Sequence, residues 1–194
     1  LALAWVDCET QRRFYTEVLP TFATGQYHGL TVRIGLPANH SIPDLLNQYW
    51  PGPDKHTLAP IAASVGKAIS LGLLVGCALL ARGRTDRLGD AGLFGAVTVL
   101  MLVTPVYTYE HHLLMALFPA AVVGTALADG RLGRLGWAVA LPAYFFTAWP
   151  LYWLRPVQKA LPELHWWLQE SKFFGLVILG LLCALTAWTG RKVR

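Results

Sequence analysis

The chain has 194 residues, of which 55% are hydrophobic and only 14% are charged, and its formal net charge at pH 7 is +5. A soluble domain usually carries about a quarter charged residues, so this composition excludes an ordinary soluble enzyme and predicts an all-α integral membrane protein. The basic residues do not gather on one soluble face, which argues against a nucleic-acid partner. The three cysteines show no CxxC spacing, which argues against a disulfide framework.

The first residues form an apolar run, LALAWV, with neither a Met nor a basic segment before it. A secretory signal peptide would carry a basic segment there. We interpret this run as the end of an earlier transmembrane helix and expect the chain to be the C-terminal part of a longer protein. On this interpretation residues 1–59 are that helix end plus an extracytoplasmic loop, and residues 60–194 are a transmembrane bundle.

The predicted outer loop contains two candidate amphipathic helices. Phe14, Val18 and Leu19 recur at helical spacing before Pro20, a pattern typical of a helix that lies on the membrane surface.

The second helix begins after Ser41, because residues 41–44 match the [ST]xx[DE] capping box and so predict a short helix over residues 42–50. Asn39, His40 and Ser41 also form an N-x-S sequon, a glycosylation signal in some hosts. The plainer interpretation is that Asn39 and Ser41 only cap the helix.

Five apolar stretches approach the roughly 20 residues that a bilayer core requires: 60–81, 92–109, 111–128, 136–154 and the shorter 173–188. Basic residues lie in alternate connections, at 82–87, at 131–134 and in the tail after residue 190. The positive-inside rule therefore predicts that these three segments are cytoplasmic. Residues 7–59, the turn at 104–112 and residues 155–172 then face outward.

Two further polar positions have simple explanations. Lys67 lies about 10 Å into the first span, at a rise of 1.5 Å per residue, and either its stem reaches the outer interface or its charge meets a lipid phosphate in a polar cavity. In the segment before the last span, Leu161, Leu164 and Leu168 form one apolar stripe, typical of an interfacial helix.

The sequence YEHH, at residues 109–112, lies in the outward turn between two spans. We predict Thr108 as the N-cap of the next helix, with Glu110, His111 and His112 in its first turn. The free N–H groups of a helix start attract anions, and the imidazoles can donate hydrogen bonds to a phosphate or move a proton. The alternative is that they are ordinary interfacial side chains. Adjacent helical residues point about 100° apart, so the pair cannot hold one metal ion as HExxH does.

Three stretches in order, FYTEVLPTFATG, NHSIPDLL and TPVYTYEHHLLMALFPA, resemble the polyprenol-phosphate-dependent glycosyltransferases of family 87. These are membrane enzymes of the GT-C fold and include bacterial mannosyltransferases. The resemblance covers about residues 14–121. It departs from the family pattern at His40, where Gln is usual, and at residues 107–110, which replace a Ser-Trp pair before the histidines.

The resemblance implies a GT-C helical bundle in the cell membrane, crossing it several times, with its site at the extracytoplasmic face. The implied reaction moves a sugar, mannose in the first instance, from a polyprenyl-phosphate donor to a lipid or glycan acceptor. We expect no cofactor and no metal ligands, and expect the carboxylate base in an outer loop that precedes Leu1. The predicted catalytic residues are His112 and His111, and the predicted substrate-binding residues are Asn39, Ser41, Tyr109, Glu110 and Lys67.

Two other classes of protein remain open at this stage. A transporter or channel component would use Lys67 as a substrate site and the histidines as a proton relay, but the spans are otherwise nearly free of charge. A non-catalytic membrane scaffold would use residues 7–59 as a surface for a partner.

Overall fold

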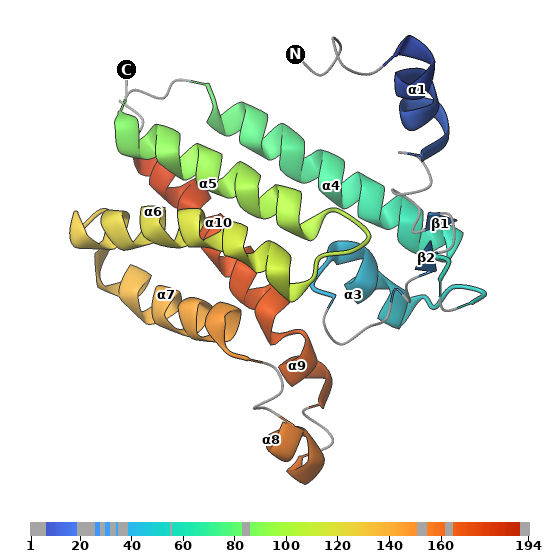
Figure 1. The fold of residues 1–194 in the computed structure, drawn as a ribbon. Helices are drawn as coiled ribbons and strands as arrows, with labels where there is room; N and C mark the ends of the chain where they lie inside the picture. Colours follow the sequence, from blue (N-terminus) through green and yellow to red (C-terminus); the bar gives the residue numbers. More distant parts are fainter. Residues whose placement is uncertain are drawn as a thin grey trace.

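The computed structural model describes residues 7–18, 26–27, 30–31, 34, 39–54, 56–82, 86–150, 155–161 and 165–190. These residues are almost entirely helical, which confirms the predicted helical fold class (Figure 1). The exception is one antiparallel pair of two-residue strands, Gln26–Tyr27 (β1) and Leu30–Thr31 (β2). It lies in the predicted outer loop, for which we had expected only helices.

The helices in chain order are α1 (Cys8–Arg13), the π-helix η2 (Phe14–Val18), α3 (Ile42–Tyr49), α4 (Pro60–Leu80), α5 (Arg87–Val103), the 3₁₀-helix η3 (Glu110–Ala116), α6 (Leu117–Ala128), α7 (Gly133–Ala148), α8 (Arg155–Ala160), α9 (His165–Gln169) and α10 (Ser171–Thr189). The first predicted surface helix corresponds to α1 and η2, and its described side chains are not buried. Leu19 and Pro20 lie outside the described residues.

Three helical segments of the described chain are long and apolar enough to cross a membrane: Pro60–Leu80, His111–Ala128 and Ser171–Thr189. They correspond to the first, third and fifth predicted spans. The other two predicted spans form α5, with 17 residues, and α7, with 16 residues. At a rise of 1.5 Å per residue these two helices are about 25 Å long, slightly short of a 30 Å hydrocarbon core.

Helix α10 is the centre of the bundle, since it packs against α4, α5, α6 and α7 (Figure 1). Its contact with α5 is close because glycines face it. A Cβ added to Gly92 would lie 2.8 Å from the Cys183 carbonyl oxygen, and one added to Gly95 would lie 2.8 Å from the Cys183 sulfur. Small residues of this kind let membrane helices approach at backbone distance.

The hydrophobic core has two parts. One part joins α5, α6, α7 and α10 around Val123, Ala140 and Leu179. The other part fixes α3 to the bundle, because Ile42 and Leu46 pack there with residues of α4, α5, η3 and α10. The short helix of the outer loop is thus held by buried apolar contacts.

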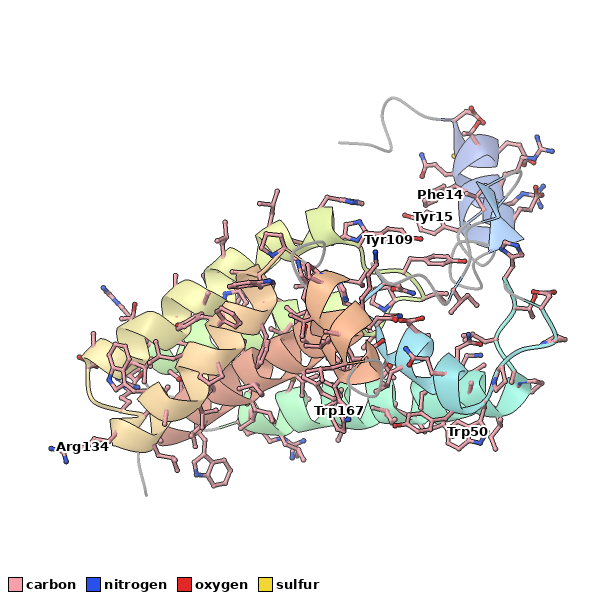
Figure 2. All side chains as sticks on the ribbon, turned by 90° about the horizontal axis from the view of Figure 1, so that it is seen from below. Phe14, Tyr15, Trp50, Tyr109, Arg134 and Trp167 are labelled. Atoms are coloured by element: carbon pink, nitrogen blue, oxygen red, sulfur yellow. The ribbon has the colours of Figure 1, made fainter. Side chains whose placement is uncertain are left out.

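The three basic connections meet at one end of the bundle. Arg131, after α6, donates hydrogen bonds to both carboxylate oxygens of Asp86, before α5, at 3.1 and 3.0 Å. A Cβ added to Gly190, after α10, would lie 2.9 Å from the same carboxylate. Figure 2 shows Arg134 at this end and Trp50 at the opposite end. The basic connections and the non-basic connections thus lie at opposite ends of the helical bundle.

The start of the third predicted span differs from our prediction. Its N-cap is Tyr109, and the first seven residues form the 3₁₀-helix η3 before α6 begins. Thr108 does not cap it, because the Thr108 hydroxyl donates instead to the Leu102 carbonyl, near the end of α5. The Thr108 side chain therefore bonds to the end of the preceding helix instead of capping the next one.

We expect Gly92→Ala to destabilise the bundle, because the added methyl group would meet the α10 backbone at 2.8 and 2.9 Å and force α5 and α10 apart. Overpacking of this kind costs about 1 to 3 kcal/mol. Gly72→Ala on α4 is the matched control, since no described atom lies within 4 Å of its added Cβ. Unfolding in mixed detergent micelles measures both variants, and equal stability of the two would contradict the close contact between α5 and α10.

Candidate functional site

Asn39 joins the outer loop to the turn that carries the histidines. Its amide nitrogen donates to the carbonyl oxygens of Ile34 and Val106, at 3.0 and 2.9 Å. Its amide oxygen accepts from the Thr108 N–H at 2.9 Å, and the His40 N–H donates to the Thr108 carbonyl at 2.9 Å. Because Asn39 is fully buried, its side chain takes the place of water as the hydrogen-bond partner of the backbone in both chain segments. We call this contact the Asn39 clamp.

Ser41 acts both as a cap and as part of the same contact. Its hydroxyl oxygen accepts from the Asp44 N–H at 3.2 Å, which confirms the predicted N-cap of α3, and donates to the Val106 carbonyl at 3.1 Å. The capping box is only half formed, however. The Asp44 carboxylate has no hydrogen-bond partner among the described residues, so it does not return a bond to the Ser41 N–H.

The two histidines lie side by side at the start of η3, with ring centroids 4.0 Å apart. His111 is exposed and His112 is half-buried. The His112 Nδ1 accepts from the Tyr109 N–H at 3.2 Å, so the proton of neutral His112 lies on Nε2. The Tyr109 ring lies about as far from each imidazole, with centroids 6.0 and 6.2 Å away. His112 therefore offers its Nε2–H as a donor to a ligand.

A pair of buried carboxyl groups lies close to this turn, and neither of them was among the predicted site residues. Asp44 of α3 and Glu170, which precedes α10, are both completely buried. The Gln48 amide donates to one Glu170 oxygen at 2.5 Å, and the other Glu170 oxygen has no hydrogen-bond partner among the described residues. Parts of the three predicted outer segments, 7–59, 104–112 and 155–172, thus contribute to one corner of the bundle.

Burial changes the acidity of both carboxyl groups. It raises the pKa of Asp44 to about 8, and the nearby charge of Glu170 adds to this increase. It also raises the pKa of Glu170, while the hydrogen bond from Gln48 opposes that effect. Burial likewise raises the pKa of Tyr109, with smaller contributions from Tyr107 and Asp44. At neutral pH the Asp44 carboxyl is therefore largely protonated.

The sequence contained little that would have revealed this pair. The capping-box match predicted that the Asp44 carboxylate bonds to the backbone at the start of the helix, so there was no reason to expect a buried carboxyl group there. Glu170 immediately precedes an apolar helix, where a carboxylate is equally typical of the membrane interface. Among the described residues, no three His, Cys, Asp or Glu side chains gather to hold a metal ion.

The remaining two predicted site residues are not part of the corner as described. Lys67 is exposed on α4, one residue after Gly66, the point where α4 faces Leu46 of α3. The Glu110 backbone begins η3, whereas its side chain lies outside the described residues. The structure thus brings Asn39, Ser41 and His112 together through the turn at 106–109 and leaves Lys67 apart.

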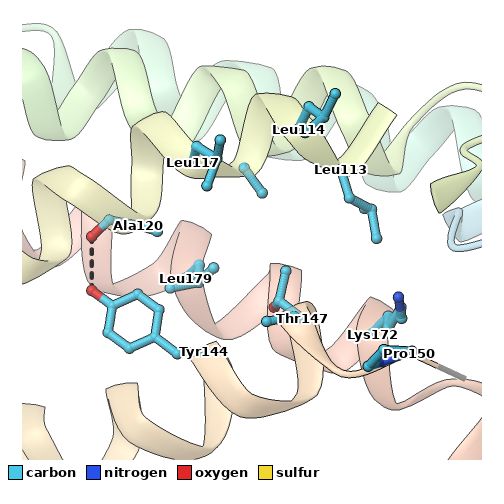
Figure 3. Close-up of a pocket in the computed structure, with 11 residues that line it drawn as sticks. Leu113, Leu114, Leu117, Ala120, Tyr144, Thr147, Pro150, Lys172 and Leu179 are labelled. Atoms are coloured by element: carbon cyan, nitrogen blue, oxygen red, sulfur yellow. Dashed lines mark hydrogen bonds between the residues drawn. The ribbon is translucent and has the colours of Figure 1, made fainter. Parts of the chain in front are cut away.

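An apolar groove of about 400 Å³ adjoins the corner, between η3, α6, α7 and α10 (Figure 3). Tyr144 closes one end, where its hydroxyl donates to the Ala120 carbonyl at 2.7 Å. Lys172 and Pro150 lie at the other end. Lys172 is only 4% exposed, and of the described residues that line the groove it alone is charged.

Comparisons with protein-family models, with curated proteins and with solved structures each found no match for this chain.

We expect Asn39→Ala to cost about 3 kcal/mol of unfolding free energy, since it strands buried backbone groups that each cost about 1 to 3 kcal/mol when unpaired. Asn47→Ala, on the adjoining helix α3, is the matched control. The Asn47 side chain accepts a hydrogen bond from the Gly52 N–H at 3.2 Å, near the helix end, and the loss of that bond costs about 1 kcal/mol. Unfolding in mixed micelles followed by circular dichroism compares them. Equal losses of unfolding free energy in Asn39→Ala and Asn47→Ala would show that the Asn39 clamp does not contribute substantially to stability.

We expect the stability of the protein to fall as the pH rises from about 4 to about 8. The folded-state pKa of Asp44, about 8, lies above its unfolded value near 3.8, so folding retains a proton that the unfolded chain has released. We expect a loss of at least 1.4 kcal/mol, about the equivalent of one pKa unit.

Asp44→Asn removes the ionisable group and flattens this dependence, leaving the contribution of Glu170, whose pKa is raised in the same direction. Asp54→Asn is the control. Hydrogen bonds lower the pKa of that exposed carboxylate, so its replacement leaves the loss of stability between pH 5 and 8 in place. Thermal unfolding at pH 5 and pH 8.5 distinguishes them. Parallel pH profiles for the parent and Asp44→Asn would contradict the assignment.

Proposed function

We propose that this chain functions in a membrane glycosyltransferase that moves a sugar, mannose in the first instance, from a polyprenyl-phosphate donor to a lipid or glycan acceptor. One observation carries the proposal. Two stretches that resemble family 87, at residues 39–46 and 104–120, are joined at one corner by the Asn39 clamp. A shared site requires segments distant in sequence to meet in this way, whereas a scaffold surface on residues 7–59 does not.

The chemistry of sugar transfer suits the groups at this corner. Breaking the bond between the sugar and the phosphate leaves negative charge on a phosphate oxygen, and donors already in place there lower the barrier. The Nε2–H of His112 is such a donor, because Nδ1 is engaged by the Tyr109 N–H. The exposed imidazole of His111 lies beside it.

In this proposal Asn39 and Ser41 are positioning residues. Their side-chain polar atoms bond to backbone groups of residues 34, 44, 106 and 108. They hold the turn that presents Tyr109, Glu110, His111 and His112.

We further propose that the protein crosses the cell membrane several times, with α5 and α7 spanning it beside the three longer helices, and that the corner faces the extracytoplasmic side. The positive-inside rule supports this orientation, because the basic connections meet at the end of the bundle opposite to the corner. A transporter finds less support, since Lys67 lies on the exposed side of α4 rather than in the groove.

We expect His112→Asn to lower the rate of sugar transfer by about 100- to 1000-fold, the usual effect of losing one donor to a developing negative charge. The shorter side chain keeps an acceptor near the position of Nδ1, for the Tyr109 N–H, and removes the Nε2–H donor. His111→Ala tests the neighbouring ring, and His56→Ala in the outer loop is the control. Full-length enzyme with a prenyl-phosphate sugar donor gives the measurement. Transfer within about threefold of the parent in both variants, below any such loss, would refute a catalytic role.

A further inference from the structure

We propose that the buried carboxyl groups of Asp44 and Glu170 form a proton-dependent switch that controls the docking of α3. While this pair holds a proton, α3 stays against the bundle. When both groups ionise, α3 is released together with the turn that carries the histidines. This inference rests on the proposed function, since the site that the switch regulates is the proposed site of sugar transfer. We call these two residues the acid pair.

The acid pair lies between α3 and the start of α10. The Gln48 amide donates a hydrogen bond to one oxygen of Glu170 at 2.5 Å, which holds that face of α3 against the N-cap residue of α10. Asp44 lies four residues before Gln48, one helical turn away on the same face of α3. Both carboxyl groups therefore lie on the side where α3 meets the bundle, and both residues are completely buried.

Little in the interior compensates two negative charges on the acid pair. Both oxygens of Asp44 and one oxygen of Glu170 have no hydrogen-bond partner among the described residues. Neither group forms a salt bridge within that part of the chain. An unpaired buried charge is costly, and a second like charge nearby increases the cost. The docked helix therefore favours a proton on the pair, and the hydrogen bond from Gln48 to Glu170 makes Asp44 the residue that holds it.

The direction of the pH dependence follows from the acidity of Asp44. Burial and the charge of Glu170 raise its pKa from 3.8 to about 8 while α3 is docked, whereas release of α3 returns the carboxyl group to water. The proton that only the docked state retains stabilises docking fully below pH 3.8, and this contribution is lost as the pH rises toward 8. Release of α3 is thus favoured by higher pH.

Other titratable groups lie beside α3 or on the elements packed against it: His40 before α3, Lys67 on α4, Tyr109 in the turn, Glu110, His111 and His112 in η3, and Lys172 on α10. An imidazole gains its charge as the pH falls, so its ionisation would weaken docking on the acidic side. Burial raises the pKa of Tyr109 above its ordinary value of 10.0, so the phenol ionises at higher pH. A loss of docking between pH 5 and pH 8 is therefore the signature of the acid pair.

Release of α3 affects the histidines through the Asn39 clamp. The residues directly before α3 make hydrogen bonds to the backbone of residues 106 and 108. Tyr109 follows, and its backbone N–H donates to the Nδ1 of His112 at 3.2 Å. Movement of α3 away from the bundle thus removes the partners that fix the turn, and with them the orientation of the His112 ring.

Hydrogen exchange of the full-length protein in nanodiscs tests the switch, with labelling times scaled to the intrinsic exchange rate at each pH. We expect the protection of α3 and of residues 106–112 to fall by a factor of about 10 or more between pH 5 and pH 8, the equivalent of one pKa unit. The amides of α5 and of the middle of α10 are expected to keep their protection. Asp44→Asn, which stays neutral, is expected to lose most of this dependence. Asp54→Asn, which changes an exposed carboxylate, is the control and is expected to behave as the parent.

Glu170→Gln provides a second variant in case Asp44→Asn does not fold. It removes the second charge and leaves Asp44 buried, so we expect a reduced pH dependence. Constant protection of α3 in the parent would overturn the proposal, as would a parallel profile in Asp44→Asn or an unreduced dependence in Glu170→Gln. Loss of protection in α5 and α10 together with α3 would also overturn it, because that result indicates unfolding of the whole bundle.

Sugar transfer is measured on the same samples across this pH range. The transfer rate of Asp44→Asn relative to the parent is expected to rise with pH, which a loss of stability that is equal at every pH would not produce. Transfer without pH-dependent protection of α3 would refute the switch and leave the proposed function standing. Release of α3 that Asp44→Asn prevents, in a full-length protein that transfers no sugar, would refute the proposed function and leave the switch standing.

Discussion

The hydrogen bonds of Asn39 are the constraint on which the corner depends. A side-chain amide can donate twice and accept on its oxygen, and this one does so with carbonyl and N–H groups of two separate chain segments. Since the turn at 106–109 has no regular secondary structure, its backbone groups need partners of this kind. The amide therefore fixes both the approach of α3 and the conformation from which η3 begins.

The rest of the corner follows from that docking. Once α3 lies against the bundle through Ile42 and Leu46, Asp44 is carried into the interior and meets Glu170 at the start of α10. Gln48 of the same helix then bonds to Glu170. A short helix of eight residues thus brings an acid, an amide and an N-cap against the central helix of the bundle.

Periodicity and capping chemistry were sufficient to predict much of this fold. Long apolar runs predicted α4, α6 and α10, and Ser41 marked the start of α3, because a helix start and a span both depend on local sequence. Thr108 was misassigned because its hydroxyl bonds to Leu102, at the end of the preceding helix α5, an alternative that a rule for helix starts does not consider. The β1–β2 pair is too short to produce an alternating pattern.

The site was predicted less completely, and the reason is physical. Asn39, Ser41 and the histidines stood out because polar residues beside apolar spans are unusual. Asp44, Glu170 and Lys172 did not, because their positions in the sequence are equally typical of solvated groups at an interface. What distinguishes them is burial by elements distant in the chain, and a single sequence does not contain that information.

The ionisation of the two carboxyl groups bears directly on whether an anion can bind near them. Two carboxylates beside a phosphate would repel it, and on that argument alone the corner would be a poor phosphate site. Burial removes the objection, since with its pKa raised to about 8 the Asp44 carboxyl is mostly neutral at pH 7, and the pKa of Glu170 is shifted in the same direction. The same burial that weakens the two acids therefore lowers the repulsion that an anion would meet at this corner.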